Sequence, residues 1–170
     1  MFGIKKNLGK QLKSQAEMLG ACKKGLDNLE NLSEHELVNR YIHFIDFAVS
    51  ANFPSNEFIK ENFDKEILHK HNIYVDECVE RRNARTVVVI QGKCTGNLFY
   101  DSFTTSDIYV RHDSDISIDC SRMSKVFINL YDNAKVHISQ RDGATVYVYK
   151  HGDKCKVSYE GEVMVRRSGV

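Results

Sequence analysis

A short sequence motif recurs about every ten residues through the second half of the chain. Each copy alternates β-branched or aromatic residues with polar ones. The steps between the first apolar residues of successive copies are 8, 10, 10, 10, 11 and 6 residues. A period of two within each copy predicts β-strands, and the run Thr86–Ile90 ahead of them predicts a buried strand. The copies lie at 106–110, 115–118, 125–128, 135–138, 145–148, 156–159 and 162–165.

Turn-forming residues separate these copies, as in Asp132-Asn133 and Asp142-Gly143. Asn and Gly tolerate positive φ, and Asp can bond to its own backbone, so a tight corner every ten residues is sterically reasonable. A small residue follows at each corner, two positions before the first valine of the next strand. It should therefore face the interior on the same side as that valine. These residues are Ala134, Ala144 and Cys155.

Short strands at a fixed spacing permit two architectures, an antiparallel β-meander or a β-solenoid with two strands per turn of about 20 residues. A meander of this length leaves a continuous apolar face to cover, whereas a coil buries its inward valines against the opposite wall. We therefore favour an α+β fold. A helical domain over residues 1–80 would precede a C-terminal β-solenoid (a single-stranded β-helix) over residues 81–170.

The first half shows helical spacing instead. Apolar residues three and four apart, from Ile4 to Leu19, predict an amphipathic helix that ends near Gly20, and a short helical stretch follows it. Ser33 and Glu36 form a capping-box pattern that opens a helix to about residue 48. Pro54 then separates this helix from one over 55–63. The sequence thus predicts four short helices.

Charge and composition exclude several classes of protein. The chain has 42% hydrophobic and 28% charged residues, which is ordinary for a globular protein, and 24 basic residues against 23 acidic ones. This balance argues against nucleic-acid binding by the whole chain. Residues 1–80 have a net charge of −3 and residues 81–170 of +4. The two halves could therefore attract each other or bind different partners.

Targeting and redox signals are absent from the sequence. The longest apolar run is only 87–90, and the first eight residues lack the apolar stretch of a secretory signal. We expect a cytoplasmic protein with no membrane contact. The cysteines are scattered and odd in number, which argues against a disulfide framework and a CxxC metal site, and we expect neither a metal ion nor a cofactor. Three of them should be small interior residues of the coil: Cys94, Cys120 and Cys155.

If alternate copies of the repeat stack on opposite walls of the coil, the outward residues form two distinct rows. One wall would present Tyr109, Phe127 and Tyr147 in a line, with Tyr149 beside them. The other wall would present a polar row, Ser117, His137 and Ser158. Three explanations of the aromatic wall remain open. The N-terminal helices could cover it, another subunit could dock on it, or it could stack on sugars or bases.

The densest polar cluster of the repeat is Arg111-His112-Asp113-Ser114-Asp115. Only residues two apart share a face of a strand, so His112 could act with Ser114, or Arg111 with Asp113 and Asp115. The alternative is a corner at which His and Asp satisfy backbone groups. His69-Lys70-His71 is interpreted as a solvated loop rather than a metal site, because further ligands are missing nearby.

Several stretches resemble small proteins of bacteriophages and of mobile elements of gut anaerobic bacteria. They are Gly20–Gly25, Ile45–Phe47 with Asn52–Ser55, Ile73–Glu77 and Tyr109–Ser114. The resemblance implies a bacterial host cytoplasm and a role in phage–host conflict or virion assembly, and it supplies no catalytic residue. The second half is also similar to the repeats of β-helical scaffolds and adhesin heads, which mostly bind.

These observations favour a non-enzymatic interaction or scaffold protein that presents a rigid solenoid face to a protein partner or to a second copy. The residues expected to make the contact are Tyr109, Phe127, Tyr147, Tyr149, Arg111, His112 and Asp113. The alternative is a small-ligand protein that binds a nucleotide or a sugar through Arg111, His112, Asp113 and Arg141. A hydrolase using His112 and Ser114 is a third hypothesis, for which an orienting group is missing from the sequence.

Overall fold

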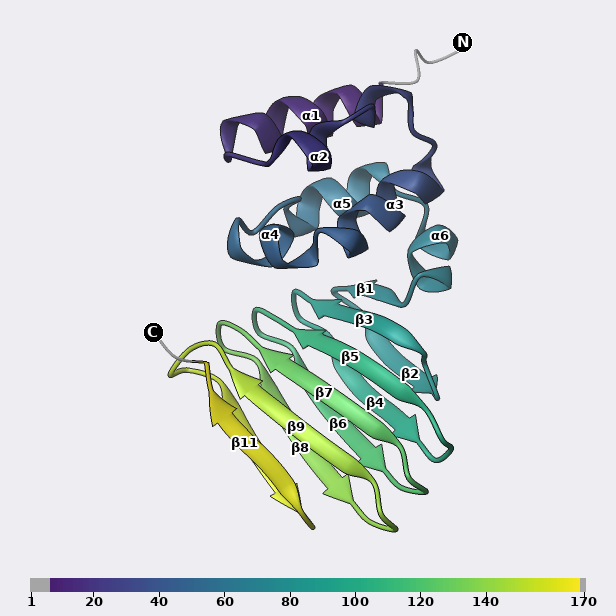
Figure 1. The fold of residues 1–170 in the computed structure, drawn as a ribbon, viewed down its shortest axis with the longest axis vertical. Coiled ribbons are helices and arrows are strands. Elements are labelled where there is room, and N and C mark those ends of the chain that lie inside the picture. Colours follow the sequence, from purple (N-terminus) through teal and green to yellow (C-terminus); the bar gives the residue numbers. More distant parts are fainter. Residues whose placement is uncertain (1–6, 169–170) are drawn as a thin grey trace. The chain divides into compact units, whose positions relative to one another are not determined.

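A computed structural model describes residues 7–168 of the chain. The chain divides into two compact units, Met1–His71 and Asn72–Val170 (Figure 1), and each unit is described by itself. The division lies at residue 71 rather than at residue 80. This difference changes the charge distribution, because Asp76, Glu77 and Glu80 belong to the second unit. Residues 1–71 carry 10 basic and 10 acidic side chains, so the predicted charge contrast between the units largely disappears.

Six α-helices and a 3-10 turn form the described part of the first unit, where the sequence predicted four helices. The predicted helix to residue 48 is broken at Phe44, whose backbone lies at φ −110° and ψ 35°. The sixth helix replaces the predicted loop at His69–His71. The elements are α1 (Leu8–Met18), α2 (Lys23–Leu26), η1 (Leu29–Asn31), α3 (Glu34–His43), α4 (Ile45–Ser50), α5 (Asn56–Asn62) and α6 (Lys65–Lys70).

Side-chain caps explain where these helices begin. The predicted capping box is confirmed, because the Glu36 carboxylate accepts from the Ser33 backbone N–H at 2.7 Å and the Ser33 hydroxyl accepts from the Glu36 N–H. Hydrogen bonds from the Ser33 hydroxyl and backbone also lower the pKa of Glu36. Asp64 starts α6 by accepting from the N–H groups of Glu66 and Ile67. Ile4, predicted on the first helix, lies outside the described residues.

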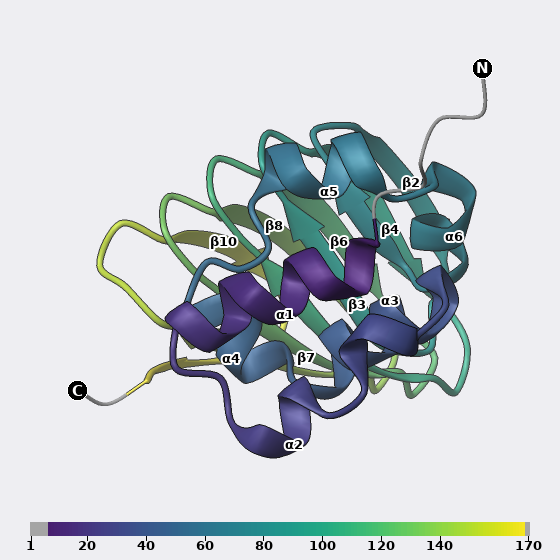
Figure 2. The ribbon, with the colours of Figure 1, turned by 90° about the horizontal axis from the view of Figure 1, so that it is seen from above.

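The second unit is a parallel β-solenoid. Strands alternate between two sheets along the chain, and Figure 2 shows the five-stranded sheet in the order β10–β8–β6–β4–β2. We call this sheet B and the six-stranded sheet, β1–β3–β5–β7–β9–β11, sheet A. Sheet A contains β1 (Ile73–Val75), β3 (Thr86–Gln91), β5 (Thr105–Val110), β7 (Lys125–Leu130), β9 (Thr145–Lys150) and β11 (Val163–Arg167). Sheet B contains β2 (Cys78–Arg82), β4 (Thr95–Tyr100), β6 (Asp115–Cys120), β8 (Lys135–Gln140) and β10 (Lys156–Glu160).

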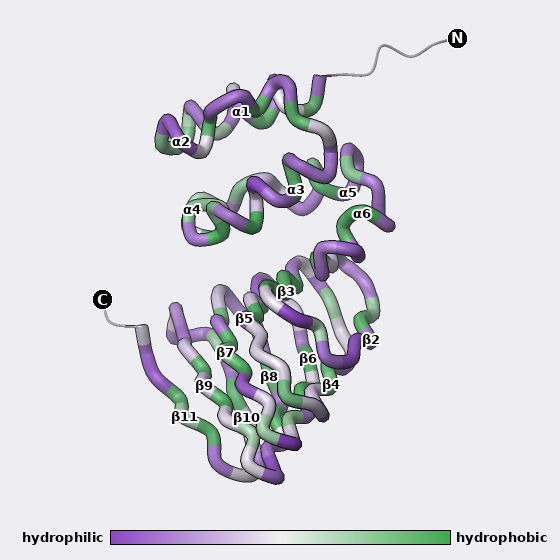
Figure 3. Tube along the Cα trace, turned by 45° about the vertical axis from the view of Figure 1, so that its right-hand side comes forward, coloured by the Kyte–Doolittle hydropathy of each residue, from purple (hydrophilic) through white to green (hydrophobic). Residues whose placement is uncertain are grey.

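The pairing confirms the solenoid and excludes the antiparallel meander. Every described strand pair is parallel, and Lys125 pairs with Thr105 on one side and Thr145 on the other, 20 residues away in each direction. Hydropathy alternates along the strands (Figure 3), so one side of each sheet faces the interior. The core between the sheets is built from aliphatic side chains such as Ile108, Ile128 and Val148, all fully buried.

The corners at residues 111–114, 131–134 and 141–144 share one backbone feature. The second corner residue adopts the left-handed conformation, with φ of 58° at His112, 57° at Asp132 and 51° at Asp142. The predicted small interior residues are confirmed, because Ala134, Ala144 and Cys155 are all buried. Cys94 and Cys120 are buried as well, as expected. Among residues 7–168, no helix is long and apolar enough to cross a membrane.

Candidate functional site

The outward face of sheet A carries aromatic side chains in rows that run across the strands. Phe127 pairs in register with Tyr147, and their rings stack with centroids 5.3 Å apart and planes 9° apart. The Lys125 ammonium lies 5.3 Å from the Phe127 ring centroid, and the Arg166 guanidinium lies 5.9 Å from that of Tyr147. Cations at the edges of a ring stack are attracted to the aromatic faces.

The predicted single line of Tyr109, Phe127 and Tyr147 is wrong. Tyr109 pairs with Asn129, and Asn129 pairs with Tyr149, so these residues form a second row two positions along the strands. The residue in register with Phe127 on β5 is Asp107. On β5, the residue in register with the inward-facing Val126 is the polar Ser106, whose hydroxyl accepts from the Tyr100 hydroxyl and donates to the Thr86 carbonyl. The first apolar residue of this copy is therefore Ile108. Aligning the copies by their first apolar residues shifts β5 by two positions relative to β7.

A third row was missed from the sequence. The Tyr131 and His151 rings stack with centroids 4.2 Å apart and planes 3° apart. The His151 Nε2 atom also lies 3.1 Å from the Asn129 Oδ1 atom, which links this row to the second one. Both residues lie at the start of a corner, outside the repeated strand motif. The alternating pattern therefore gave no reason to place them on the aromatic face. Sheet A thus presents aromatic rings in three successive rows at β7 and β9, and Asn129 on β7 interrupts the middle row.

The predicted cluster at Arg111–Ser114 is a structural corner. His112 Nδ1 accepts from the Gly92 N–H at 3.0 Å, and the His112 N–H donates to Asp132 at 3.0 Å. Burial, followed by the nearby Arg111 charge, lowers the pKa of His112. The Ser114 hydroxyl is fully buried, accepts from the Cys94 N–H and donates to the Gly92 carbonyl. His112 and Ser114 therefore join successive turns of the coil, and Ser114 offers no accessible nucleophile.

The remaining members of that cluster also fail to converge. Arg111 is only 3% exposed and its Nη1 atom lies 3.5 Å from Gln91 Oε1, whereas the Asp113 carboxylate accepts from the Asn133 amide at 2.9 Å. Arg141 begins a corner at the opposite edge of the sheets, where it donates to Asp119 at 2.8 Å. The predicted four-residue ligand site is therefore not assembled.

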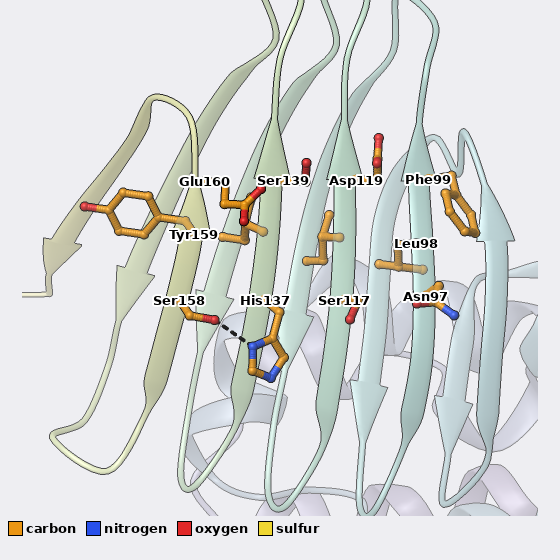
Figure 4. A pocket seen from close by; sticks show the side chains of 12 residues that line it. Asn97, Leu98, Phe99, Ser117, Asp119, His137, Ser139, Ser158, Tyr159 and Glu160 are labelled. Carbon is orange, nitrogen blue, oxygen red and sulfur yellow. Dashed lines mark hydrogen bonds between the residues drawn. The ribbon is translucent and has the colours of Figure 1, made fainter.

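The outward face of sheet B carries the predicted polar row, which is confirmed. Ser117 pairs with His137, and His137 pairs with Ser158. His137 Nδ1 lies 2.6 Å from the Ser158 Oγ atom (Figure 4), and its Nε2 lies 3.0 Å from Asp115 Oδ1. We call these three side chains the Asp115–His137–Ser158 relay. The sequence reasoning placed His137 and Ser158 together but did not connect them with Asp115.

A groove of about 490 Å³ lies on this face of sheet B (Figure 4). Side chains from β4, β6, β8 and β10 line it, so it runs across the strands. Hydroxyl, amide and carboxylate groups dominate its outward rows, and Phe99 lies at one end of it in Figure 4. The polar lining residues are Asn97, Ser117, Asp119, His137, Ser139, Ser158 and Glu160. Two members of the relay, His137 and Ser158, therefore face a space that can hold a small molecule.

The buried thiols of Cys94 and Cys120 are poor nucleophiles. Burial raises the pKa of Cys94, and it raises that of Cys120 to about 12, so these interior thiols stay protonated at neutral pH. Over residues 7–168, no group of three or more His, Cys, Asp or Glu side chains is placed to hold a metal ion.

Comparison with known proteins finds no significant match to a protein-family model, to a curated protein or to a solved structure.

Proposed function

We propose that this protein works by association, and that the aromatic face of sheet A pairs with the same face of a second copy. The observation that carries the proposal is the stacked pair Phe127 and Tyr147, flanked by Lys125 and Arg166. Both rings are partly exposed on a rigid parallel sheet. Aromatic and Arg side chains are enriched in the centres of protein interfaces, and aromatic rings bury a large area at a small entropic cost.

The strand order makes this face self-complementary. A two-fold axis parallel to the strands and between β7 and β9 exchanges β7 with β9 and β5 with β11. It places Phe127 of one copy against Tyr147 of the other. It also brings Asp107 on β5 to the strand that carries Arg166. The Arg166 guanidinium leans over Tyr147, which lies in the same row as Asp107, so opposite charges meet at both ends of the pair.

A charge-swap series tests this arrangement by sedimentation velocity over a range of protein concentrations. We expect Asp107→Arg and Arg166→Asp each to weaken the dimer about tenfold or more, because each places like charges opposite one another. The double swap should restore most of the affinity. Phe127→Ser with Tyr147→Ser should abolish association while the circular-dichroism spectrum is retained.

Phe99→Ser is the matched control, because it removes one partly exposed aromatic side chain from sheet B instead of sheet A. It should leave the dimer unchanged. A wild-type protein that stays monomeric at high concentration, or single and double swaps with equal effects, would contradict the proposed pairing.

A further inference from the structure

The geometry points to a second activity on the opposite sheet: Ser158 is a nucleophile for acyl transfer, with His137 as its general base and Asp115 as the group that orients His137. This inference goes beyond the association proposed above and does not depend on it. Its basis is the Asp115–His137–Ser158 relay, in which three adjacent strands, β6, β8 and β10, contribute one side chain each.

The carboxylate determines which ring nitrogen can act as the base. An ionised Asp115 only accepts hydrogen bonds, so the 3.0 Å contact requires that His137 Nε2 carries a proton. The neutral ring then presents an unprotonated Nδ1 atom to Ser158. The Ser158 hydroxyl must donate to that atom across the 2.6 Å contact. The hydroxyl proton thus already points along the path on which a base would remove it.

Rigid neighbours hold this arrangement. His137 lies on β8, which pairs with β6 on one side and β10 on the other, so both of its partners come from in-register strands. The other Asp115 oxygen lies 4.0 Å from the Lys135 ammonium. Ser117 also pairs in register with His137, yet the short contact of the ring is with Ser158. Functional groups placed on strands keep their geometry better than groups on loops.

A reacting ester has both space and a hydrogen-bond donor beside Ser158. The groove is lined by Ser158, His137 and Glu160, so an acyl group can approach the hydroxyl from the solvent side. β10 is the last strand of sheet B in the described chain, and Lys156 donates its N–H to the carbonyl of Ala134, the residue just before β8. Because backbone groups alternate in direction along a strand, the Tyr159 N–H points away from β8. It directly follows the nucleophile and can donate to a developing oxyanion.

The reaction would follow the usual two steps of acyl transfer. Ser158 Oγ forms a bond to the carbonyl carbon of an ester while its proton passes to His137 Nδ1. Collapse of the tetrahedral intermediate breaks the bond to the leaving alcohol, which takes the proton from His137. Water then attacks the acyl-Ser158 ester with the same base, which releases the acid and restores the hydroxyl. The substrate class is therefore a carboxylic ester.

A fluorophosphonate probe tests the nucleophile directly on the full chain. The Ser158 oxygen would form a bond to phosphorus, the phosphorus–fluorine bond would break, and fluoride would leave with the hydroxyl proton. We expect peptide mass spectrometry to find the adduct on Ser158. His137→Gln and His137→Ala should slow labelling about 100-fold or more, because general-base assistance contributes that much. Asp115→Asn should slow it as well.

Ser50→Ala is the matched control, since Ser50 is an exposed serine on α4 that does not line the groove, and it should leave the labelling rate unchanged. Release of nitrophenol from p-nitrophenyl acetate should show a burst that is lost in Ser158→Ala. Circular dichroism establishes that each variant is folded, and both His137 variants replace an exposed side chain. Absence of an adduct on Ser158, or equal labelling of the wild type and a folded His137 variant, would overturn the assignment.

Discussion

At the residue scale, one column of small side chains limits how closely sheets A and B can approach each other at a corner. Cys94, Ser114, Ala134 and Cys155 occupy the same corner position in four successive turns, and each is at most 2% exposed. Each directly precedes a strand of sheet B, where the chain passes from one sheet to the other. The space at this corner is therefore matched to a side chain of two heavy atoms or fewer, and a larger one would force the sheets apart.

Substitutions at Ala134 measure this limit. Ala134→Leu should lower the free energy of unfolding by about 1–3 kcal/mol, because it adds three carbon atoms to a filled corner. Ala134→Cys should cost less, since cysteine occupies the equivalent positions 94 and 155. Urea unfolding followed by circular dichroism compares the two variants. A leucine variant as stable as the wild type would show that the corner is not sterically limited.

At the element scale, the short helices depend on caps and on contacts with one another. α6 has only six residues, and it packs against α3, from which His35 reaches His71 at the end of α6. The ring nitrogens, His35 Nδ1 and His71 Nε2, are 3.3 Å apart. One ring must supply a proton and the other a lone pair, so the contact requires at least one neutral imidazole.

This contact predicts an acid-sensitive helical unit. Burial, followed by the charge of a protonated His35, lowers the pKa of His71 below its usual value of 6.5. The unfolded chain therefore binds a proton more readily than the folded chain. The stability contribution of His71 is complete above pH 6.5 and declines as the pH falls through the lowered value.

Thermal unfolding followed by the helical circular-dichroism signal at pH 8 and pH 5 measures this effect. The wild type should lose more stability between the two conditions than His71→Gln, which does not titrate. An equal loss in both proteins would contradict the role of the histidine pair and would leave other groups, such as His112, as the source of the pH dependence.

At the scale of the whole molecule, each of the two units contains a buried hydrophobic cluster of its own. Leu12, Leu29 and Leu37 form the buried centre of one helical cluster, whereas the solenoid core runs continuously through the turns of the coil. The solenoid is stabilised mainly by contacts between neighbouring turns, as in other repeat architectures. A defect in one unit should therefore be confined largely to that unit.

Hydrogen exchange on two cavity variants tests this separation. Leu37→Ala should destabilise the helical unit by about 2–5 kcal/mol and raise exchange in α1 and α3, with little change in β5–β9. Ile128→Ala should do the reverse, because its side chain is fully buried between the sheets. Equal loss of protection in both units after either substitution would show that the chain unfolds as one cooperative body.

The strands from β5 to β10 could be predicted because their alternating pattern recurs at a spacing of about ten residues. The strands β1, β2 and β4 were missed because their patterns are weak: β2 buries only Val79, and β4 contains Gly96 and Asn97. Gly96 lies at φ 130°, and a Cβ atom there would overlap the Val79 backbone, so close packing excludes an alternating residue at that point. The break at Phe44 had no such local signal.

The relay was harder to predict than the strands that carry it. Asp115, His137 and Ser158 are separated by 22 and 21 residues, close to one turn of the coil. This spacing becomes informative only when alternate copies are known to stack in parallel and in register. A search among sequence neighbours instead selected Arg111–Ser114, in which His112 and Ser114 hydrogen-bond to the backbone of an adjacent turn.

From the amino-acid pattern alone we could infer strands in which valines and isoleucines alternate inward and corners occupied by small residues, whereas the pattern only favoured a coil over a meander. These properties follow from side-chain alternation along a strand and from the backbone preferences of Asp, Asn and Gly, which are local. Only the tertiary structure decided which outward residues meet, because a shift of two residues in register moves Tyr109 out of the row of Phe127. Contacts across strands depend on that register, and the packing of buried neighbours selects it.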